Sequence, residues 1–565
     1  MTILICVTLL FGFSEENFLP QWLTPQEQLR LDEIGKYYIP LQPPDGWVET
    51  PAEFEPLRGV FITWIYSQSS YRPIFREIVR EVAEVCKCYI IASASDTINI
   101  KNYLSSGGVP FDSIIFYTWP YNSIWIRDYG PWFIRRHNNS EAMVDFIYNR
   151  PRPADDTISR LISRNWLIPC YNSPLTHPGG NFMVDGIGTG FASNLIQTEN
   201  SSFTRRQIDS LMQLYSGLDQ FVIVQRINIE YTGHIDLWTK ILNDTLIMVG
   251  EYAPGHSNYA LLNQHALTFA NTKNREGINY RIVRIPMPYS TSSAPPSYLN
   301  SLFVNNKVLV PTWSLPEDDT ALAIYQNALP NHEIVGINCA AMSGSGGAIH
   351  CITMQIPKSQ YIHIRHLQLA NTNDTTNPYR IRAQIISSSS ITNANLYYLT
   401  NDSQLITVPL NQLPDTQGVY IGYIPAHSYG DTVRYWFSVS NSQGLTRRSP
   451  NYQPYTYSFI ITSSPAVTQE NKKYILASYK IYPNPTHRTA NFIINIDKPG
   501  QVKVEIYNPL GQKIKTLVNS YLTSGNYNLS WNFQNEENQK ISYGTYLYRI
   551  VTEQEIKTGK ILYLK

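Results

Sequence analysis

A repeated pattern of one helix followed by two strands runs through residues 54–357 and constrains the fold more than any other feature of the chain. Apolar strand pairs in it include 220–225 with 235–241, and 301–304 with 308–313. Five segments have the spacing of amphipathic helices: 71–86, 155–167, 204–218, 258–271 and 317–328. A fivefold repeat predicts a closed α/β ring, in which polar loops at one end of the central strands converge on the axis.

The pattern changes after Pro357, where short alternating strands replace the helical period. Alternation over about a hundred residues predicts an immunoglobulin-like β-sandwich. A second all-β region follows a polar stretch, and 565 residues are too many for one ordinary domain. We therefore expect six parts: a signal peptide (1–20), a leader or pro-segment (21–44), a helix-and-strand domain (45–358), an immunoglobulin-like domain (359–462), a linker (463–474) and a C-terminal β domain (475–565).

Composition limits the classes of partner. The chain has 44 Lys and Arg against 43 Asp and Glu, so its charge gives no reason to expect a nucleic-acid partner. The apolar run 2–13 is too short to span a bilayer and is typical of a secretory signal, although it lacks a basic start and a buried strand is the alternative. Without Cys6, five cysteines remain, so at least one thiol stays free. No Cys and His spacing resembles a zinc site, and we expect neither a metal nor another cofactor.

Four segments of the first domain combine reactive side chains with glycines: 125–132, 177–186, 233–238 and 344–351. Taken singly, each has a structural explanation. Asp128 could pair with Arg127, His234 could be a core histidine, and Cys351 could be a small buried apolar residue. Taken together, two aspartates, a histidine and a cysteine beside glycines indicate a site where the backbone approaches a ligand closely.

These segments resemble the agmatine deiminase and bacterial peptidylarginine deiminase family over residues 45–360. The resemblance rests on motifs that occur in the family's order: WIRDYGP at 125–131, GGN at 179–181, GHID at 233–236, SYLN at 297–300 and GGAIHC at 346–351. It implies the pentein fold, a five-bladed α/β propeller, which agrees with the count of five repeats. It also implies hydrolysis of a guanidinium group.

The resemblance assigns roles to individual residues. Asp128 and Asp236 are expected to bind the guanidinium, a planar cation that only donates hydrogen bonds. Cys351 is expected to attack the guanidinium carbon, and His234 to protonate the departing ammonia and then activate water. Asn300 is expected to orient the cysteine or the covalent intermediate, with a turn-capping role as the alternative. Two nearby carboxylates should raise the pKa of the thiol, so we expect a thiolate–imidazolium pair completed by the cationic substrate.

Substrate contacts are expected from Trp125, Asn181, Tyr231 and the arginine pair Arg150 and Arg152. The arginines stand at i and i+2 and precede prolines, which favours an extended backbone with both side chains on one side. A fork of this kind suits a carboxylate, and the resemblance implies that it receives the substrate's α-carboxylate. Two solvated loop arginines are the alternative. The functional interpretation predicts a preference for arginine at a peptide's C-terminus.

The C-terminal region carries a second resemblance. YPNP at 482–485, VKVEIYNPLGQKI at 502–514 and GTYLYRI at 544–550 resemble the sorting domain of the bacterial type IX secretion route. This implies a secretion-machinery partner, export from a Gram-negative cell, and attachment of the cargo to surface lipopolysaccharide. An ordinary β-sandwich binding module is the alternative.

Three other functions compete with a secreted peptidylarginine deiminase. An agmatine deiminase-like hydrolase of small guanidines is the nearest, but it needs no signal, sandwich or sorting domain. An amidinotransferase would pass the amidino group to an amine. A surface adhesin would have no reason to keep Asp128, His234, Asp236 and Cys351 together.

Overall fold

The computed structural model describes residues 18–136, 140–228, 230–288, 290, 294–401, 403–414, 418–451, 454–462, 476–496, 500–509, 511–522, 525–552 and 556–565. The chain forms two compact units, which meet in sequence between Ile461 and Thr462. Most of the expected signal peptide, including Cys6, and all of the expected linker at 463–474 lie outside the described residues. In the described parts, no helix has the length and apolar character needed to cross a membrane.

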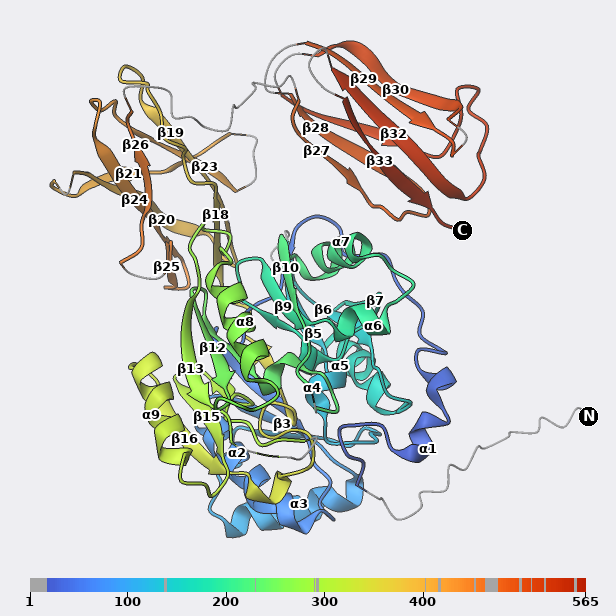
Figure 1. Ribbon diagram of the computed structural model, residues 1–565, viewed down its shortest axis with the longest axis vertical. Helices are drawn as coiled ribbons and strands as arrows, with labels where there is room; N and C mark the ends of the chain where they lie inside the picture. Colours follow the sequence, from blue (N-terminus) through green and yellow to red (C-terminus); the bar gives the residue numbers. More distant parts are fainter. Residues whose placement is uncertain are drawn as a thin grey trace, which may run out of the picture. The chain divides into compact units, whose positions relative to one another are not determined.

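The first unit begins with five small sheets, counted over the described part of residues 48–357 (Figure 1). In sheet order their strands are β1 (Val48–Glu49), β5 (Trp132–Arg136), β6 (Glu141–Ile147) and β7 (Cys170–Thr176); β10 (Gln220–Val224), β9 (Thr189–Ser193) and β8 (Met183–Val184); β11 (Thr239–Asn243), β12 (Leu246–Glu251) and β13 (Arg281–Pro286); β14 (Leu302–Val304), β15 (Lys307–Thr312) and β16 (Glu333–Asn338); and β17 (Thr353–Pro357), β2 (Leu57–Thr63), β3 (Lys87–Ile91) and β4 (Ile114–Tyr117).

The five sheets share one internal pattern. In each, an antiparallel pair is followed by a parallel strand: β5–β6–β7, β8–β9–β10, β11–β12–β13, β14–β15–β16 and β17–β2–β3. The last pattern joins the two ends of the region, because β17 pairs with β2. A fivefold repeat is therefore confirmed, but the expectation of two strands per repeat is wrong. Each repeat has three strands, and the additional ones are as short as the two residues of β8, too short to show alternation.

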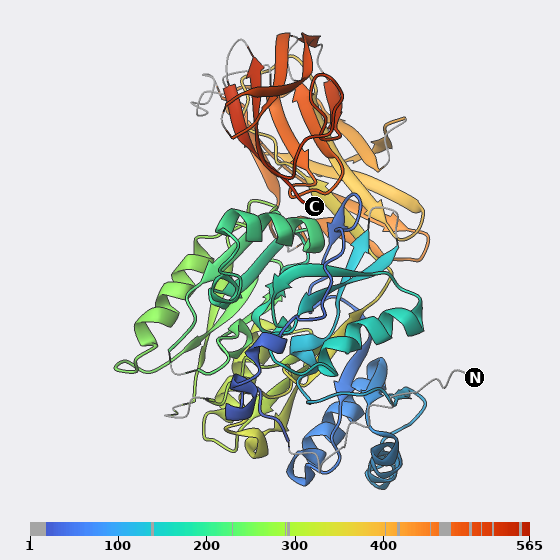
Figure 2. The ribbon, with the colours of Figure 1, turned by 90° about the vertical axis from the view of Figure 1, so that its right-hand side faces the viewer.

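The five expected helices are confirmed, and each connects the second strand of its three-strand pattern to the third. They are α2 (Arg72–Val85), α5 (Ile158–Trp166), α7 (Arg205–Ser216), α8 (Tyr259–Ala270) and α9 (Asp318–Ala328). Figure 2 shows helices along the outer edge of this region. The further helices are α1 (Pro25–Gln28), α3 (Ala94–Ser106), α4 (Ile126–Tyr129), α6 (Leu195–Glu199) and the 3-10 turns η1 (Leu31–Glu33), η2 (Ser69–Tyr71), η3 (Asp155–Thr157), η4 (Gly179–Asn181), η5 (Ile235–Leu237) and η6 (Ala340–Met342).

One expected strand pair is wrong and the other is confirmed. β10 pairs in parallel with β9 and not with residues 235–241. Residues 235–237 form the turn η5, and every side chain there is buried, so the apolar pattern does not distinguish a strand from a turn. The pairing of 301–304 with 308–313 is confirmed as β14 against β15.

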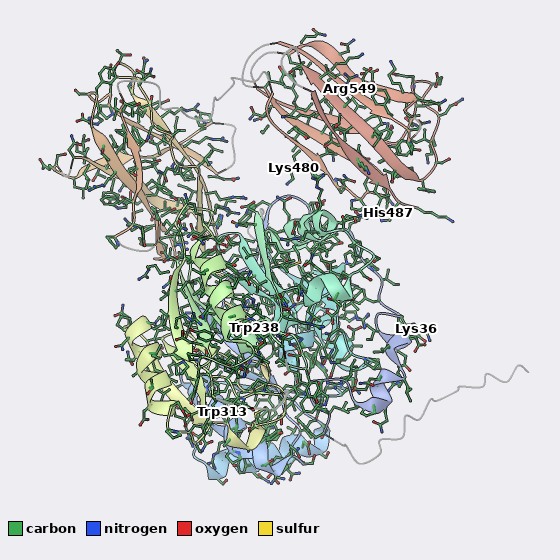
Figure 3. The ribbon with its side chains drawn as sticks, viewed as in Figure 1. Lys36, Trp238, Trp313, Lys480, His487 and Arg549 are labelled. Atoms are coloured by element: carbon green, nitrogen blue, oxygen red, sulfur yellow. The ribbon has the colours of Figure 1, made fainter. Side chains whose placement is uncertain are left out.

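A single hydrophobic core extends through all five sheets, from Val48 to Ile356. Its largest members are fully buried tryptophans such as Trp64, Trp125 and Trp238, and Figure 3 labels Trp238 inside the first unit. A common core fixes the five sheets as one rigid body, so the turns at the strand ends have defined relative positions.

The rest of the first unit is β-rich. Two antiparallel sheets bury one shared hydrophobic cluster that includes Leu396 and Phe437. Their strands are β18 (Ile362–His366), β19 (Tyr379–Ser387), β23 (Val419–Ile424) and β22 (Asn411–Gln412) in one sheet, and β21 (Ile406–Pro409), β20 (Ile391–Thr400), β24 (Thr432–Asn441), β25 (Thr446–Ser449) and β26 (Tyr457–Ile460) in the other.

The second unit is also built from antiparallel strands around its own core, which includes Phe492, Ile550 and Trp531. Its sheets contain β27 (Leu476–Tyr482), β28 (Ala490–Ile496) and β31 (Gly525–Trp531), and β30 (Lys513–Leu522), β29 (Gly500–Tyr507), β32 (Gly544–Thr552) and β33 (Ile556–Tyr563).

Candidate active site

The expected catalytic residues and Asn181 lie in equivalent places, in the turn that precedes the first strand of each three-strand pattern. In chain order these are Asp128 in α4 before β5, Asn181 in η4 before β8, His234 and Asp236 at η5 before β11, Asn300 before β14, and Cys351 before β17. Each of the five sheets therefore contributes at least one residue. The sequence pattern predicted polar loops at one end of the central strands, and the structure places these residues before the first strand of each pattern.

Three of the side chains meet at Gly180. A Cβ atom on this glycine would lie 2.7 Å from His234 Nδ1, 2.8 Å from Asp128 Oδ1 and 3.2 Å from Asp236 Oδ2. The Gly180 N–H donates to Asp128 Oδ1 at 3.1 Å, and His234 Nδ1 lies 3.3 Å from that same oxygen. Only glycine leaves room for this approach of two carboxylates and an imidazole.

Asn300 connects the carboxylate side of the site to the cysteine. Its Nδ2 donates to Asp236 Oδ2 at 3.1 Å and lies 3.1 Å from Cys351 Sγ, while its Oδ1 accepts the N–H groups of Ala348 and Cys351. Asp236 Oδ2 is 3.4 Å from the same sulfur. All four hydrogen-bonding positions of the carboxamide are thereby directed at the cysteine loop and Asp236, which fixes the thiol beside the carboxylate.

Burial and charge set the protonation of the site. Burial raises the pKa of the Cys351 thiol well above its ordinary value, and the charges of Asp236 and Asp128 add to this effect, as expected from the sequence. Burial lowers the pKa of His234, although Asp128 and Asp236 oppose it. For Asp236, burial acts to raise the pKa, but the hydrogen bond and charge of His350 outweigh it, and the pKa lies below the ordinary value.

A buried ionic network that the sequence did not indicate lies behind Asp236. His350 bridges two carboxylates, with Nδ1 2.7 Å from Asp236 Oδ2 and Nε2 2.7 Å from Glu53 Oε1. Glu53 also pairs with Arg127 at 3.0 Å and Lys240 at 2.6 Å. Arg127 thus pairs with Glu53, and not with its neighbour Asp128. The position of His350 next to Cys351 in the sequence could have indicated that it belongs to the site, whereas nothing in the sequence linked Glu53 to the site.

The expected substrate-binding residues divide into two groups. Trp125, Arg150, Arg152 and Tyr231 all contact residues 18–27 of this same chain. Asn181 does not join them, because both ends of its carboxamide bind the backbone of Ser193 in β9.

An N-terminal segment enters the site, which the sequence did not indicate. The fully buried Gln21 side chain donates from Nε2 to Asp128 Oδ2 at 3.1 Å and lies 3.3 Å from Cys351 Sγ. Gln21 is separated from the cysteine by 330 positions in the chain, so no local pattern predicts the contact.

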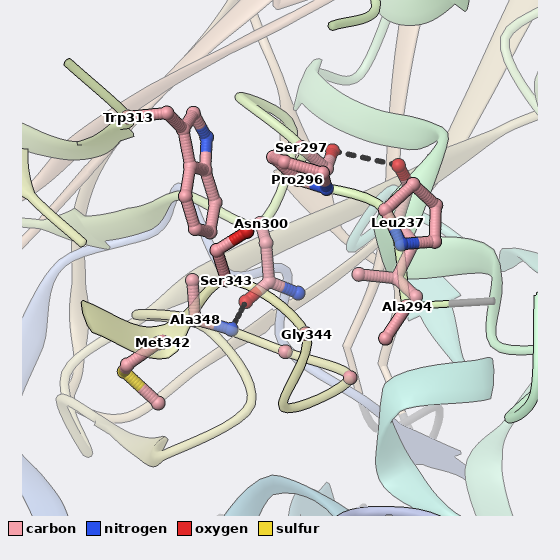
Figure 4. Close-up of a pocket in the computed structure, with 13 residues that line it drawn as sticks. Leu237, Ala294, Pro296, Ser297, Asn300, Trp313, Met342, Ser343, Gly344 and Ala348 are labelled. Atoms are coloured by element: carbon pink, nitrogen blue, oxygen red, sulfur yellow. Dashed lines mark hydrogen bonds between the residues drawn. The ribbon is translucent and has the colours of Figure 1, made fainter. Parts of the chain in front are cut away.

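A small cavity lies beside the cysteine loop, lined in part by Asn300, Gly347 and Trp313 (Figure 4). The same view shows the hydrogen bond between Asn300 and Ala348. The cavity volume is about 10 Å³, room for roughly one water molecule and too little for an arginine side chain.

Comparison with known proteins identifies the family. A model of the Porphyromonas-type peptidyl-arginine deiminase family matches residues 49–357, more than half of the chain. The chain belongs to this family. Its members act as deiminases of guanidino groups, so the enzyme class is hydrolysis of a guanidino C–N bond.

Individual deiminases match the same region. A Vibrio parahaemolyticus protein named as an agmatine deiminase is 25% identical over 351 residues, covering 54% of this chain and 96% of the relative. The solved agmatine deiminase of Enterococcus faecalis is 20% identical with a TM-score of 0.50, covering 56% of this chain and all of that one. A Porphyromonas gingivalis structure described as an arginine deiminase is 22% identical with a TM-score of 0.50, covering 55% of this chain and 99% of that one. The structural matches establish a pentein-like α/β fold for the first region of this chain.

A second family model, the secretion system C-terminal sorting domain, matches residues 480–563. This confirms the sorting domain expected from the sequence. The deiminase is therefore a protein of the Gram-negative secretion route, delivered outside the cell or to its surface.

Proposed function

We propose that this deiminase hydrolyses arginine in peptides and proteins, preferentially at their C-termini, to citrulline and ammonia. The observation that carries the proposal is the convergence of one thiol, two carboxylates, one imidazole and one carboxamide from four of the five sheets, while the fifth sheet contributes Gly180. Carboxylates that accept paired hydrogen bonds suit a guanidinium, and a thiol between them is placed to attack its carbon.

The proposed reaction has two halves. Asp128 and Asp236 hold the guanidinium, and the Cys351 thiolate adds to its carbon. His234, as imidazolium, protonates the departing ammonia, which leaves a thiouronium on the sulfur. His234 then removes a proton from water, the water oxygen adds to the same carbon, and the thiolate leaves as citrulline forms.

Protonation makes this reaction depend on the substrate. Burial favours a neutral thiol and a neutral imidazole in the site as described. A bound guanidinium adds a positive charge beside Cys351, which lowers the cost of the thiolate. The reactive thiolate–imidazolium pair therefore forms when a cationic substrate has entered.

The proposed preference for C-terminal arginine rests on Arg150 and Arg152. Both are buried and bind the same N-terminal segment, which reaches Cys351 through Gln21. Arg152 holds the Glu27 carboxylate through two hydrogen bonds, Nε at 2.7 Å and Nη2 at 3.2 Å. A substrate α-carboxylate presents the same pair of oxygens, so Glu27 serves as a stand-in for it.

Hydrolysis of agmatine is the second candidate, favoured by the names of several relatives. Agmatine lacks a carboxylate and would leave the guanidinium groups of Arg150 and Arg152 without an anionic partner.

The test is a citrulline and ammonia assay with peptides that end in arginine, peptides with internal arginine, free arginine and agmatine. We expect the highest kcat/KM for C-terminal arginine, and we expect Arg152→Ala to lower it far more for that substrate than for internal arginine. Equal losses on both peptides, or efficient turnover of agmatine by the parent enzyme, would contradict the proposal.

We further infer that the five sheets are blades of a closed propeller and that the sheets of residues 362–460 form an immunoglobulin-like sandwich. Secretion machinery is the proposed partner of the sorting domain, with surface lipopolysaccharide as the proposed attachment point.

A further inference from the structure

We propose that residues 18–29 are an intramolecular pseudosubstrate that occupies the arginine site and must leave before substrate binds. The inference rests on the proposed function, since it interprets the site as one for arginine. It assigns a ligand to that site, namely a peptide segment with a glutamine in the guanidinium position.

Gln21 supplies the central contact. Its carboxamide is planar and presents an N–H donor, as a guanidinium does. Nε2 reaches both a proposed guanidinium acceptor, Asp128, and the proposed nucleophile, Cys351. A Cβ on Gly347 would lie 2.9 Å from Gln21 Oε1 and 2.5 Å from Cys351 Sγ, so this glycine permits the approach. Glutamine carries no guanidinium carbon, and the contact is therefore unreactive toward deimination.

The main chain of the segment is held by the arginine pair. Arg150 Nε donates to the carbonyl of Gln21 at 3.0 Å, and Arg152 Nη2 donates to the carbonyls of Pro20 at 2.7 Å and Trp22 at 3.2 Å. Together with the Glu27 carboxylate, these contacts engage both arginines. A substrate carboxylate cannot use the fork until they break.

Aromatic residues hold both sides of Gln21. Trp125 Nε1 donates to the carbonyl of Leu19 at 2.9 Å, and the ring of Phe18 packs on that of Trp125. On the other side, the ring of Trp22 lies 5.2 Å from that of Tyr231. Four of the residues expected to bind substrate are thus bound by this one segment.

Substrate and segment exclude each other. An arginine side chain is longer than glutamine by its Nε and Cζ atoms, so its backbone must lie farther from Cys351 than that of Gln21 does. The segment and a substrate peptide cannot occupy the site together, and the segment has to be displaced.

The connection that follows the segment is accessible. Leu29 is 85% exposed and Tyr37 is 80% exposed, and Arg30 and Lys36 are exposed basic residues between them. Figure 3 labels Lys36 at the surface. A cut here would remove the covalent connection that follows the segment, so that non-covalent contacts would hold it to the site.

The test uses the full chain with a recognition sequence for a site-specific protease inserted between Leu29 and Arg30. Cys351 modification by iodoacetamide, followed by peptide mass mapping, and citrulline formation from an arginine peptide are measured before cutting and after dialysis. Intact mass verifies that the segment has been lost. We expect both rates to rise at least about tenfold, and a synthetic peptide of residues 18–29 to reverse the rise competitively.

Matched substitutions keep the test independent of cutting. Gln21→Ala in the uncut chain removes the two hydrogen bonds that hold the segment against the thiol. Reagent should then reach Cys351 more often, and its modification should accelerate by about tenfold. Gln213→Ala, the same change at an exposed position of α7, should leave it unchanged.

The outcomes separate the two claims. Equal Cys351 modification in uncut, cut and Gln21→Ala chains would overturn the pseudosubstrate. Faster modification after cutting without turnover of any arginine substrate would sustain the pseudosubstrate and overturn the proposed function. Equal turnover of an arginine peptide by cut and uncut chains would overturn the pseudosubstrate and sustain the proposed function.

Discussion

Replacing Asp236 by asparagine separates substrate binding from the reactivity of the thiol. Asp236 Oδ2 accepts from Asn300 and hydrogen-bonds to His350, whereas Oδ1 has no hydrogen-bond partner in the described part of the chain. An asparagine oriented with its oxygen at the Oδ2 position keeps both contacts. Its NH₂ group then takes the place of Oδ1, the oxygen that we propose accepts a hydrogen bond from the substrate guanidinium. The substitution therefore exchanges an acceptor for a donor with little change in packing.

Two effects of opposite sign follow. A charge-assisted hydrogen bond is worth about 1.5–3 kcal/mol, so kcat/KM for an arginine peptide should fall by roughly 10-fold to 150-fold. The charge of Asp236 raises the pKa of Cys351, with Oδ2 3.4 Å from Sγ. Its removal should lower that pKa and increase the thiolate fraction at neutral pH, accelerating modification by iodoacetamide by about tenfold.

Both quantities are measured on protein freed of residues 18–29, so that access to the thiol is equal. Asp209→Asn is the matched control, because Asp209 makes a half-exposed ion pair with Arg205 away from the site. A kcat/KM within twofold of the parent would remove Asp236 from substrate binding. Slower modification of Cys351 would show that the carboxylate does not raise the pKa of the thiol.

Four other substitutions or deletions have defined outcomes. Cys351→Ala should reduce citrulline formation by several orders of magnitude without lowering the Tm, and more than a few per cent of residual activity would contradict the nucleophile. Asn300→Ala leaves the buried N–H groups of the cysteine loop unpaired. The free energy of unfolding, measured by urea denaturation, should fall by about 1–3 kcal/mol, and an unchanged denaturation midpoint would refute the orienting role. Glu53→Gln leaves Arg127 and Lys240 buried without their carboxylate. In the same assay the free energy of unfolding should fall by about 3–5 kcal/mol, whereas a smaller fall would contradict a dry, fully paired network. Deletion of residues 475–565 should abolish surface delivery in cell fractionation while the purified remainder stays active; a truncated protein found at the surface would contradict the sorting role.

Helices such as α2 were predictable because they present one broad apolar face at the helical period. α2 buries Ile74, Phe75, Ile78 and Val82 along one side. α3 was missed because its sequence is mostly polar and only Ile100 and Leu104 are buried. The strand β8 was missed for a different reason, since its two buried residues carry no alternation.

The site was predictable where its residues stand in turns with adjacent glycines, as His234 and Cys351 do. Glu53 and Gln21 were not predictable in this way. Each reaches the site from a distant segment, and its role depends on tertiary contacts with side chains far away in the chain. Sequence periodicity reports local structure, and it carries no information on such contacts.

The origin of the new oxygen atom tests the central claim most directly. Protein freed of residues 18–29 is incubated with a peptide ending in arginine in water enriched in ¹⁸O, with an added primary amine, and the peptide is analysed by mass spectrometry. Hydrolysis through Cys351 predicts one ¹⁸O atom in the ureido group of each citrulline, one ammonia released for each, and neither product from Cys351→Ala. Unchanged arginine, citrulline without the label, or transfer of the amidino group to the amine would contradict the account.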